Sequence, residues 1–275
     1  MALELDDRQR AMLLEMGVRV WLPGTDFAME DAAGPQSDPT PVAVPLQKAP
    51  VRPAPSQTVS APSLPRPVEV QSLPETHWAD LDWAQLTTKA QACEACGLFA
   101  GRTQSTLTGS ATASQTDWLV VGDPPDEDED QAGQAFAGHA GALMDNMLKA
   151  MGASRTGSGA QGAYLSNVTK CRPPHGRNPQ MAELQQCAAF LQREIALVQP
   201  KVILALGRFA IQLLLADRPD VAGLPLGKQR GTVYRYLGIP VVVSYHPKVL
   251  LRAPADKGKA WADLCLAMDV RDGLV

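Results

Sequence analysis

Five cysteines are the residues of this 275-residue chain whose type and spacing point most directly to chemistry. Cys93 and Cys96 form a C-x-x-C pair, and Cys171 and Cys187 follow at longer separations. Four thiolates that include one close pair can bind a tetrahedral zinc ion or a [4Fe–4S] cluster, and spacing alone does not choose between them. Alternatively, Cys187 is a core thiol, because free cysteine packs as a small hydrophobic residue. Cys265 has no other cysteine at ligand spacing and is interpreted as a core residue.

The elements that must position these residues alternate along the chain from about Trp78 onward. Apolar runs alternate with helical periodicity, which indicates an α/β domain with a mostly parallel sheet. The expected strands are Trp118–Gly122, Tyr164–Val168, Val202–Leu206 and Val241–Ser244. The expected helices are Ala140–Met151, Pro179–Val198, Arg208–Ala216 and Lys257–Met268. Ligands of such sheets bind beyond the carboxyl ends of the strands, so the expected site comprises the segments Gly122–Asp130, Asn167–Pro174 and Tyr245–Arg252.

Composition divides the chain into three regions: a short N-terminal helical element at 1–30, a linker at 31–77 and a domain at 78–275. Of the 23 prolines, 11 lie between Pro35 and Pro74, in a stretch without apolar periodicity. Such a segment buries too little apolar surface to offset its ordering entropy, so a disordered linker is expected. Residues Asp6–Gly17 have the spacing of a short amphipathic helix. This element either docks a protein partner or is a tail without one.

The cellular compartment is inferred from the N-terminal residues and from the length of the apolar stretches. No stretch approaches the roughly 20 apolar residues of a membrane helix, and the first residues are acidic where a signal peptide is basic and then apolar. We therefore expect a cytoplasmic protein that does not bind membranes. We also expect it to be a monomer. A disulfide framework is not expected in that reducing compartment.

Seven motifs occur in a characteristic order between about Thr87 and Met268. They are Cys93-Glu-Ala-Cys96, Arg102-Thr103, Gly122–Asp130, Gly133–Gly141, Asn167–Pro174, Ala205–Arg208 and Tyr245–Arg252. Together they resemble the family 4 uracil-DNA glycosylases, the iron–sulfur branch of the uracil-DNA glycosylase superfamily. The resemblance implies a three-layer α/β fold with a central, mostly parallel four-stranded sheet flanked by helices. It also implies that Cys93, Cys96, Cys171 and Cys187 hold a structural [4Fe–4S] cluster that takes no redox step.

The resemblance further implies a hydrolase of base excision repair that acts on uracil-containing DNA. Such an enzyme flips uracil out of the duplex and hydrolyses its N-glycosidic bond, leaving an abasic site. Asn167 has the amide donor and acceptor that can pair with the O4 and N3–H of uracil, and Phe136 can stack on the flipped base beside Gly122. The simpler interpretations are a loop-capping asparagine and a core phenylalanine.

Two residues are the expected catalytic groups. Uracil departs with negative charge, so a fixed donor to its O2 stabilises the transition state, and His246 after the last strand matches that donor. The alternative is a structural loop histidine. Asp123 is the carboxylate expected to orient water or to stabilise the sugar cation.

The acidic segment departs from the family pattern Gly-Glu-Ala-Pro-Gly-x-x-Glu-Asp. Asp123 replaces Glu, Pro124 replaces Ala and Asp126 replaces Gly, whereas Glu129 and Asp130 match. Aspartate is one methylene shorter than glutamate, so either a reduced activity or a different placement of the water is expected. A charged side chain at 126 is expected to disfavour a nearby phosphate chain.

By resemblance, the segment Pro247–Arg252 enters the minor groove, where Leu250 or Leu251 fills the space that the base leaves. The cations expected to contact DNA are Lys170, Arg172, Lys248 and Arg252. The net charge of −4 conceals their surplus: residues 1–80 hold 6 basic and 11 acidic side chains, a balance of −5, whereas residues 131–275 hold 17 and 9, a balance of +8. A basic surface of this kind suits contact with phosphates.

Two other functions remain open on the sequence alone. The departures in the acidic segment favour a non-catalytic or weakly active iron–sulfur protein that binds damaged DNA. The cysteines by themselves are also compatible with a zinc-stabilised interaction domain.

Overall fold

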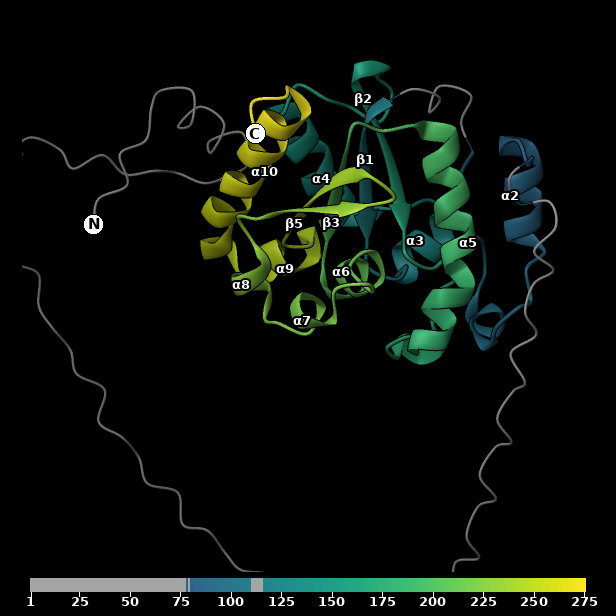
Figure 1. The fold of residues 1–275 in the computed structure, drawn as a ribbon. Coiled ribbons are helices and arrows are strands. Elements are labelled where there is room, and N and C mark those ends of the chain that lie inside the picture. Colours follow the sequence, from purple (N-terminus) through teal and green to yellow (C-terminus); the bar gives the residue numbers. More distant parts are fainter. Residues whose placement is uncertain (1–77, 79, 110–115) are drawn as a thin grey trace, which may run out of the picture. The chain divides into compact units, whose positions relative to one another are not determined.

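The computed structural model describes residues 78, 80–109 and 116–275 (Figure 1). The helical element expected at 1–30 and the linker expected at 31–77 lie outside the described residues. In the part that is described, helices and strands alternate as the sequence pattern predicts.

A five-stranded sheet forms the centre of the fold. Its strands are β1 (Thr116–Gly122), β2 (Gly159–Asn167), β3 (Val202–Leu206), β4 (Val233–Tyr236) and β5 (Ile239–Ser244). The order across the sheet is β2-β1-β3-β5-β4, with all pairs parallel except β4–β5. The four expected strands are confirmed, and they are parallel to one another. The expectation of a four-stranded sheet is wrong, because a fifth strand, β4, lies at one edge.

The additional strand, β4, forms an antiparallel hairpin with β5. The two strands are joined through Leu237 and Gly238, whose φ values are 49° and 82°. Positive φ at both central residues is typical of the two-residue turns that match the twist of a hairpin. Because β4 is only four residues long and half-buried, its sequence pattern does not distinguish it from a loop.

Nine α-helices and three 3₁₀ turns are described. The helices are α2 (Trp83–Gln91), α3 (Glu127–Ala132), α4 (Gly138–Ala150), α5 (Met181–Val198), α6 (Arg208–Leu214), α7 (Pro219–Ala222), α8 (Leu226–Gln229), α9 (Pro247–Arg252) and α10 (Lys257–Arg271). The 3₁₀ turns are Gly97–Gly101, Pro174–Gly176 and Pro254–Asp256. The four helices expected from periodicity correspond to α4, α5, α6 and α10, with their ends shifted by a few residues.

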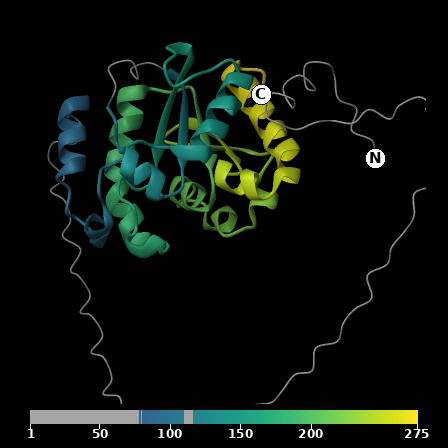
Figure 2. The same ribbon diagram turned by 180° about the vertical axis from the view of Figure 1, so that it is seen from behind.

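The helices cover both faces of the sheet, which confirms the three-layer fold (Figures 1 and 2). Trp118 and Val120 of β1 pack with α4 and α10, whereas Leu119 and Val121 pack with α5 and α6. Successive strand residues point to opposite faces, so an uninterrupted apolar run is what a sheet covered on both sides requires. Helix α2 packs outside this arrangement, through a small cluster that includes Phe190 of α5.

Parallel pairing brings the polar segments to one edge of the sheet. Gly122 at the end of β1 is in register with Asn167 of β2 and with Leu206 of β3. Leu206 is in register with Ser244 of β5, and His246 follows two residues later. The carboxyl ends of these strands therefore share the edge at which the sequence predicts a site. None of the helices in the described ranges is both long and apolar enough to cross a bilayer.

Candidate active site

A buried carboxylate, that of Glu129, joins the segments that follow β1, β2 and β5. Its Oε1 accepts hydrogen bonds from Phe136 N at 2.7 Å and Asn167 Nδ2 at 3.0 Å. Its Oε2 accepts from Asp126 N at 3.0 Å and from Lys248 Nζ at 2.6 Å. Glu129 is fully buried, so these four donors compensate a charge that water does not reach.

The amide of Asn167 is held in one orientation at the end of β2. Nδ2 donates to the carbonyl oxygen of Asp123 at 2.9 Å and to Glu129 Oε1 at 3.0 Å, which uses both of its hydrogens. The buried Oδ1 has no hydrogen-bond partner among the described residues. Asn167 therefore offers only an acceptor, whereas the sequence-based expectation was a donor and an acceptor.

His246 offers the complementary donor. It is the N-cap residue of α9 and is buried, and its Nδ1 accepts from Lys248 N at 3.2 Å. Burial, aided by the positive charge of Lys248, lowers the pKa of His246 to about 3. The imidazole is therefore neutral near pH 7, and with Nδ1 accepting, its proton resides on Nε2. Nε2 is buried and without a hydrogen-bond partner among the described residues.

Phe136 and Gly122 lie against this imidazole. The ring of Phe136 stacks on His246 with centroids 5.2 Å apart and planes inclined by 10°. A Cβ atom on Gly122 would lie 2.5 Å from Phe136 Cζ and 3.1 Å from His246 Nε2, so only glycine leaves room for both rings. The residues expected at the site from separate motifs are thus in contact.

Asp123 follows Gly122, and its carboxylate is anchored on α6. Oδ1 accepts from Phe209 N at 2.8 Å, and the carboxylate lies against Gly207, whose φ of 98° and lack of a side chain permit this approach. Burial raises the pKa of Asp123 to about 6, although the hydrogen bond from Phe209 opposes the shift. The carboxyl group therefore titrates near pH 6.

The expected DNA-contacting leucines have different environments in α9. Leu250 is fully buried in the core, whereas Leu251 is 44% exposed. Helix α9 packs Leu250 onto the domain, so of the two leucines only Leu251 has its side chain at the surface. Arg252 is exposed and its Nε donates to Lys248 O at 3.2 Å.

Lys170 is not a surface cation. Its Nζ donates to Glu194 Oε2 and Ser166 Oγ, both at 2.6 Å, and to Asn167 O at 2.8 Å. Tyr164 donates its hydroxyl to the other oxygen of Glu194 at 2.8 Å. The prediction that Lys170 contacts DNA is wrong, because this buried network consumes its ammonium group.

The other two predicted DNA-contacting cations are partly exposed and paired with carboxylates. Arg172 Nη2 lies 3.1 Å from Glu127 Oε2 on α3. Lys248 Nζ lies 2.6 Å from Glu129 Oε2 and 2.9 Å from Asp126 Oδ2.

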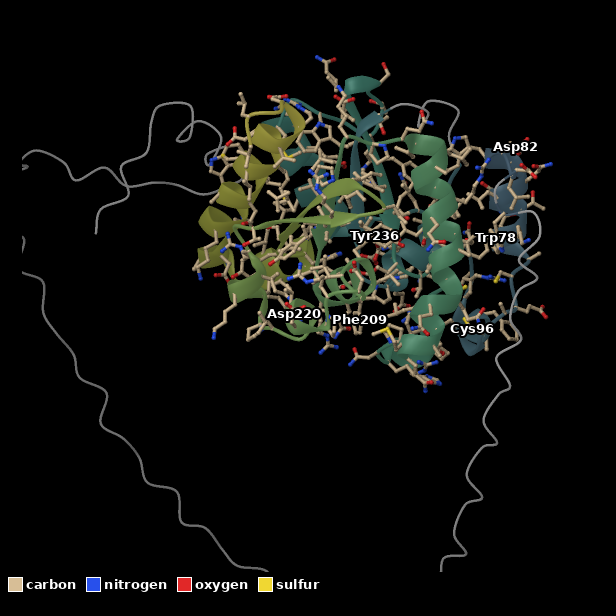
Figure 3. All side chains as sticks on the ribbon, in the orientation of Figure 1. Trp78, Asp82, Cys96, Phe209, Asp220 and Tyr236 are labelled. Carbon is tan, nitrogen blue, oxygen red and sulfur yellow. The ribbon has the colours of Figure 1, made fainter. Side chains whose placement is uncertain are left out.

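The four motif cysteines come from three segments: Cys187 lies on α5, Cys171 follows β2, and Cys93 and Cys96 follow α2. Figure 3 labels Cys96. Burial, with smaller contributions from Cys93 and Cys96, raises the pKa of Cys171 to about 11 against the opposing effect of Arg102. Burial likewise raises the pKa of Cys187 to about 12, with Cys171 and Cys96 contributing. Arg102 Nη1 donates to Cys171 Sγ at 3.3 Å and to Cys93 O at 3.1 Å.

These sulfurs form a suitable donor set for a metal centre. Arg102 contacts both the backbone of Cys93 and the sulfur of Cys171, and Cys93 packs against the same small cluster as Cys187, so these cysteines come from neighbouring segments. Burial disfavours thiolates unless a cation compensates them. Within residues 80–109 and 116–275, no three Cys, His, Asp or Glu side chains are already gathered closely enough to bind an ion.

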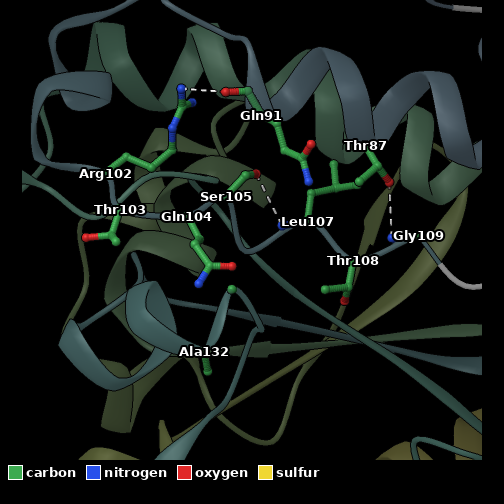
Figure 4. A pocket seen from close by; sticks show the side chains of 11 residues that line it. Thr87, Gln91, Arg102, Thr103, Gln104, Ser105, Leu107, Thr108, Gly109 and Ala132 are labelled. Carbon is green, nitrogen blue, oxygen red and sulfur yellow. Dashed lines mark hydrogen bonds between the residues drawn. The ribbon is translucent and has the colours of Figure 1, made fainter.

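A separate pocket of about 490 Å³ lies between α2, the segment 102–109 and the end of α3 (Figure 4). Hydroxyl and amide side chains such as Thr87, Gln91 and Gln104 line much of it. Arg102 at its edge donates from Nη2 to Gln91 O at 2.6 Å. The pocket contains none of the residues at the strand ends, so it is distinct from the candidate active site.

Glu129 is the important residue to which the sequence alone assigns no role. A signal for it is present: Asp126 and Glu129 are spaced as a capping box, and both reciprocal hydrogen bonds form at the start of α3. That spacing predicts the helix start. The burial of Glu129 and its bond to Asn167 depend on the packing of α3 against β2 and α9.

Comparison with known proteins identifies relatives of the described domain. The family model of the uracil DNA glycosylase superfamily matches residues 109–265. The chain is 31% identical over 173 residues to the type-4 uracil-DNA glycosylase of Archaeoglobus fulgidus, covering 62% of this chain and 83% of that relative. It is 34% identical over 168 residues to the type-4 uracil-DNA glycosylase of Thermotoga maritima, covering 61% and 82%. A type-5 uracil-DNA glycosylase of Pyrobaculum aerophilum is 30% identical over 111 residues, covering 34% and 47%.

Substitution of Glu194 by alanine is expected to lower the free energy of unfolding by about 3–5 kcal/mol, because it leaves the ammonium of Lys170 buried without its anion. Urea denaturation followed by circular dichroism measures the change. Lys201→Met is the control, since the Lys201 side chain is 63% exposed and its pair with Asp117 is expected to contribute only about 1 kcal/mol. Equal losses in the two variants would contradict the assigned role of the buried pair.

Proposed function

The chain belongs to the uracil DNA glycosylase superfamily, and we propose that it is a monofunctional DNA repair glycosylase that flips uracil out of DNA and hydrolyses its N-glycosidic bond, leaving an abasic site. We place it in the cytoplasm as a monomer. One structural observation carries the proposal: two buried polar atoms, Asn167 Oδ1 and His246 Nε2, have no hydrogen-bond partner among the described residues.

These two atoms match the edge of uracil. Buried polar groups are normally satisfied, so an unpartnered acceptor and an unpartnered donor at one edge of the sheet favour an absent ligand of complementary pattern. Uracil has an acceptor at O2 and a donor at N3–H. The Nε2–H of His246 would donate to O2, and Oδ1 of Asn167 would accept from N3–H.

The same pairing discriminates against cytosine. The N3 atom of cytosine carries a lone pair, so it would face Oδ1 of Asn167 as a second acceptor. Both Nδ2 hydrogens are held by the Asp123 carbonyl and Glu129, so the amide cannot rotate to present a donor without breaking two hydrogen bonds. A site with fixed polar atoms rejects a mismatched base strongly, because its buried groups are left unpaired.

Catalysis in this proposal depends on stabilising charge as the bond breaks. Negative charge develops on O2 of the departing uracil, and the neutral imidazole of His246 donates a hydrogen bond to it without having to lose a proton. Positive charge develops on the sugar. Above about pH 6 Asp123 supplies a carboxylate that stabilises this cation and orients the attacking water.

DNA contact is assigned to α9 and the loop after β2. Leu251 is the exposed leucine of α9 and would fill the gap left by the flipped base. Arg252 beside it and Arg172 are positioned to contact phosphates, and such contacts orient the protein without reading sequence.

Cys93, Cys96, Cys171 and Cys187 would hold a [4Fe–4S] cluster. Four soft sulfur donors from separate segments support this assignment, although the same set also suits zinc. When bound, the cluster supplies a structural cross-link between the region after α2, the loop after β2 and α5, and it takes no part in hydrolysis.

A second candidate function is supported by the position of Asp123. Its carboxylate is anchored to Phe209 N, and it is shorter than the glutamate of the family pattern. A protein that binds uracil-containing DNA without cleaving the bond would have this arrangement if the anchored carboxylate does not reach the water. Tight binding without turnover, unchanged in Asp123→Ala, would favour this function.

Wild-type protein is expected to make a uracil-containing oligonucleotide sensitive to alkali, and His246→Ala to slow this excision by about 10²–10³-fold, because a preorganised donor to O2 is lost. His139→Ala removes an exposed histidine of α4 and is expected to keep the wild-type rate. Thermal melting of each variant separates loss of chemistry from loss of fold. If the oligonucleotide stays intact after incubation with folded wild-type protein and alkali treatment, the proposal that the protein is a glycosylase is refuted.

The rate constant kcat/KM is expected to increase as the pH rises through about 6, where the Asp123 carboxyl group ionises. His246 contributes no step near pH 6–7 because its pKa is about 3. Asp123→Asn should remove the step and leave a slow, flat profile. The same titration affects stability. The folded state binds the Asp123 proton more tightly than the unfolded chain, so the contribution of this group to the free energy of unfolding is lost as the pH rises through about 6. The Asp123→Asn variant should lack this pH dependence of stability. A step of the same size in Asp123→Asn would assign it to another group.

Purified protein is expected to be brown and to contain iron and acid-labile sulfide. Cys187→Ser should reduce the visible absorption and the thermal stability, because it removes one of four ligands to the cluster. Cys265→Ser changes a cysteine outside the set and should preserve both. If the protein is colourless and contains zinc after anaerobic purification, the cluster assignment is wrong and the four cysteines bind zinc.

A further inference from the structure

Lys248 lies at the centre of the candidate site and does not project freely from it. The sequence predicts a DNA-contacting cation there. In the structure its Nζ donates to the buried Glu129 Oε2 at 2.6 Å and pairs with Asp126 Oδ2 at 2.9 Å, and only 25% of the side chain is exposed. The ammonium is therefore already occupied by two carboxylates.

The bond to Glu129 has a structural reason. Glu129 is fully buried, and a buried carboxylate needs both hydrogen bonds and a compensating positive charge. The donors from Asp126, Phe136 and Asn167 are neutral amides, so Lys248 supplies the charge. If Lys248 moved away to a phosphate, Glu129 would be left buried with neutral donors alone.

Lys248 also connects the two unpartnered atoms of the site. Its side chain holds Glu129, whose other oxygen fixes the amide of Asn167. Its backbone N–H donates to Nδ1 of His246, which fixes the imidazole as a donor at Nε2. One residue of α9 thus reaches both the acceptor and the donor.

We propose that Lys248 is a positioning residue that holds the base-reading acceptor of Asn167 and the donor of His246 in one arrangement, and that it does not contact a DNA phosphate. The inference rests on the proposed function for the identity of the base. Asp126 supports it as a second anchor for the ammonium, at the position where the family pattern has glycine. Because the Asp126 side chain is 40% exposed, the buried Glu129 is the stronger partner.

The salt dependence of DNA binding separates the two roles of Lys248. Each phosphate contact that is lost lowers the slope of log K against log salt by about 1, whereas loss of a positioning residue leaves that slope unchanged. Lys248→Met keeps the aliphatic stem and the backbone N–H but removes the ammonium. It is expected to lower kcat at least tenfold, with KM and the salt slope close to those of the wild type, and Lys248→Arg should recover part of the rate.

Two variants provide the comparison. Arg252→Met removes the exposed neighbour on α9 and is expected to lower the salt slope by about 1. Lys201→Met removes a lysine that precedes β3, at the opposite end of the sheet, and should change neither quantity. A Lys248→Met protein with a raised KM, an unchanged kcat and a salt slope lowered like that of Arg252→Met would overturn the proposal.

A double-mutant cycle tests the route through Glu129. If Lys248 acts through that carboxylate, adding Lys248→Met to Glu129→Gln causes little further loss, whereas independent effects multiply. If the losses in kcat of the two single variants multiply in the double variant, the proposal is overturned. Thermal melting of each variant reports its folding separately, so a poorly folded variant is recognised as such. If wild-type protein binds uracil-containing DNA without excising uracil, the enzyme proposal fails by itself. The readout is then the ratio of binding affinities for a uracil-containing and a cytosine-containing oligonucleotide instead of kcat. The proposal requires Lys248→Met to lower this ratio while the salt slope stays unchanged.

Discussion

The interaction on which the candidate site depends is the set of four hydrogen bonds that converge on the buried carboxylate of Glu129. A charge away from water is tolerated only when donors surround it, so its presence constrains every segment that supplies one. The donors come from the α3 N-cap, the loop before α4, the end of β2 and α9. Three parts of the chain that are distant in sequence, residues 126–136, the end of β2 and α9, are therefore held in one geometry by the need to compensate one buried carboxylate.

That geometry gives the site its chemical character. Because Glu129 and the Asp123 carbonyl take both amide hydrogens of Asn167, the remaining polar atom is an acceptor. Because the backbone of Lys248 donates to Nδ1 of His246, the remaining polar atom of the imidazole is a donor. Both atoms are fixed before any ligand arrives, and preorganised groups of this kind stabilise developing charge without a reorganisation penalty at the moment of reaction. In the proposed function, specificity for uracil and stabilisation of its departure therefore have the same structural origin.

A second buried network lies under the same strand end and adjoins the cysteine region. Lys170 donates to the carbonyl of Asn167 and to Glu194 of α5, and the next residue along the chain is Cys171. The loop after β2 therefore supports Asn167 on one side and contributes a sulfur on the other. A structural metal centre held by these cysteines would stabilise the same loop. Binding of the metal centre would then help to keep Asn167 in position, and this effect needs no redox chemistry.

The sequence by itself determined the α/β class, the four parallel strands, four of the helices and the edge of the sheet at which the polar motifs meet, because apolar periodicity and strand ends are local signals. It also named Gly122, Phe136, Asn167 and His246. Only the tertiary structure decided which of two adjacent leucines is exposed, that Lys170 is buried, and which atoms of Asn167 and His246 remain unpartnered. Residue type does not reveal these outcomes, because burial and hydrogen-bond partners depend on segments packed together from distant parts of the chain. The role of Glu129 is the clearest case: its spacing from Asp126 predicts a helix start, but its function arises from the strand and the helix that close over it.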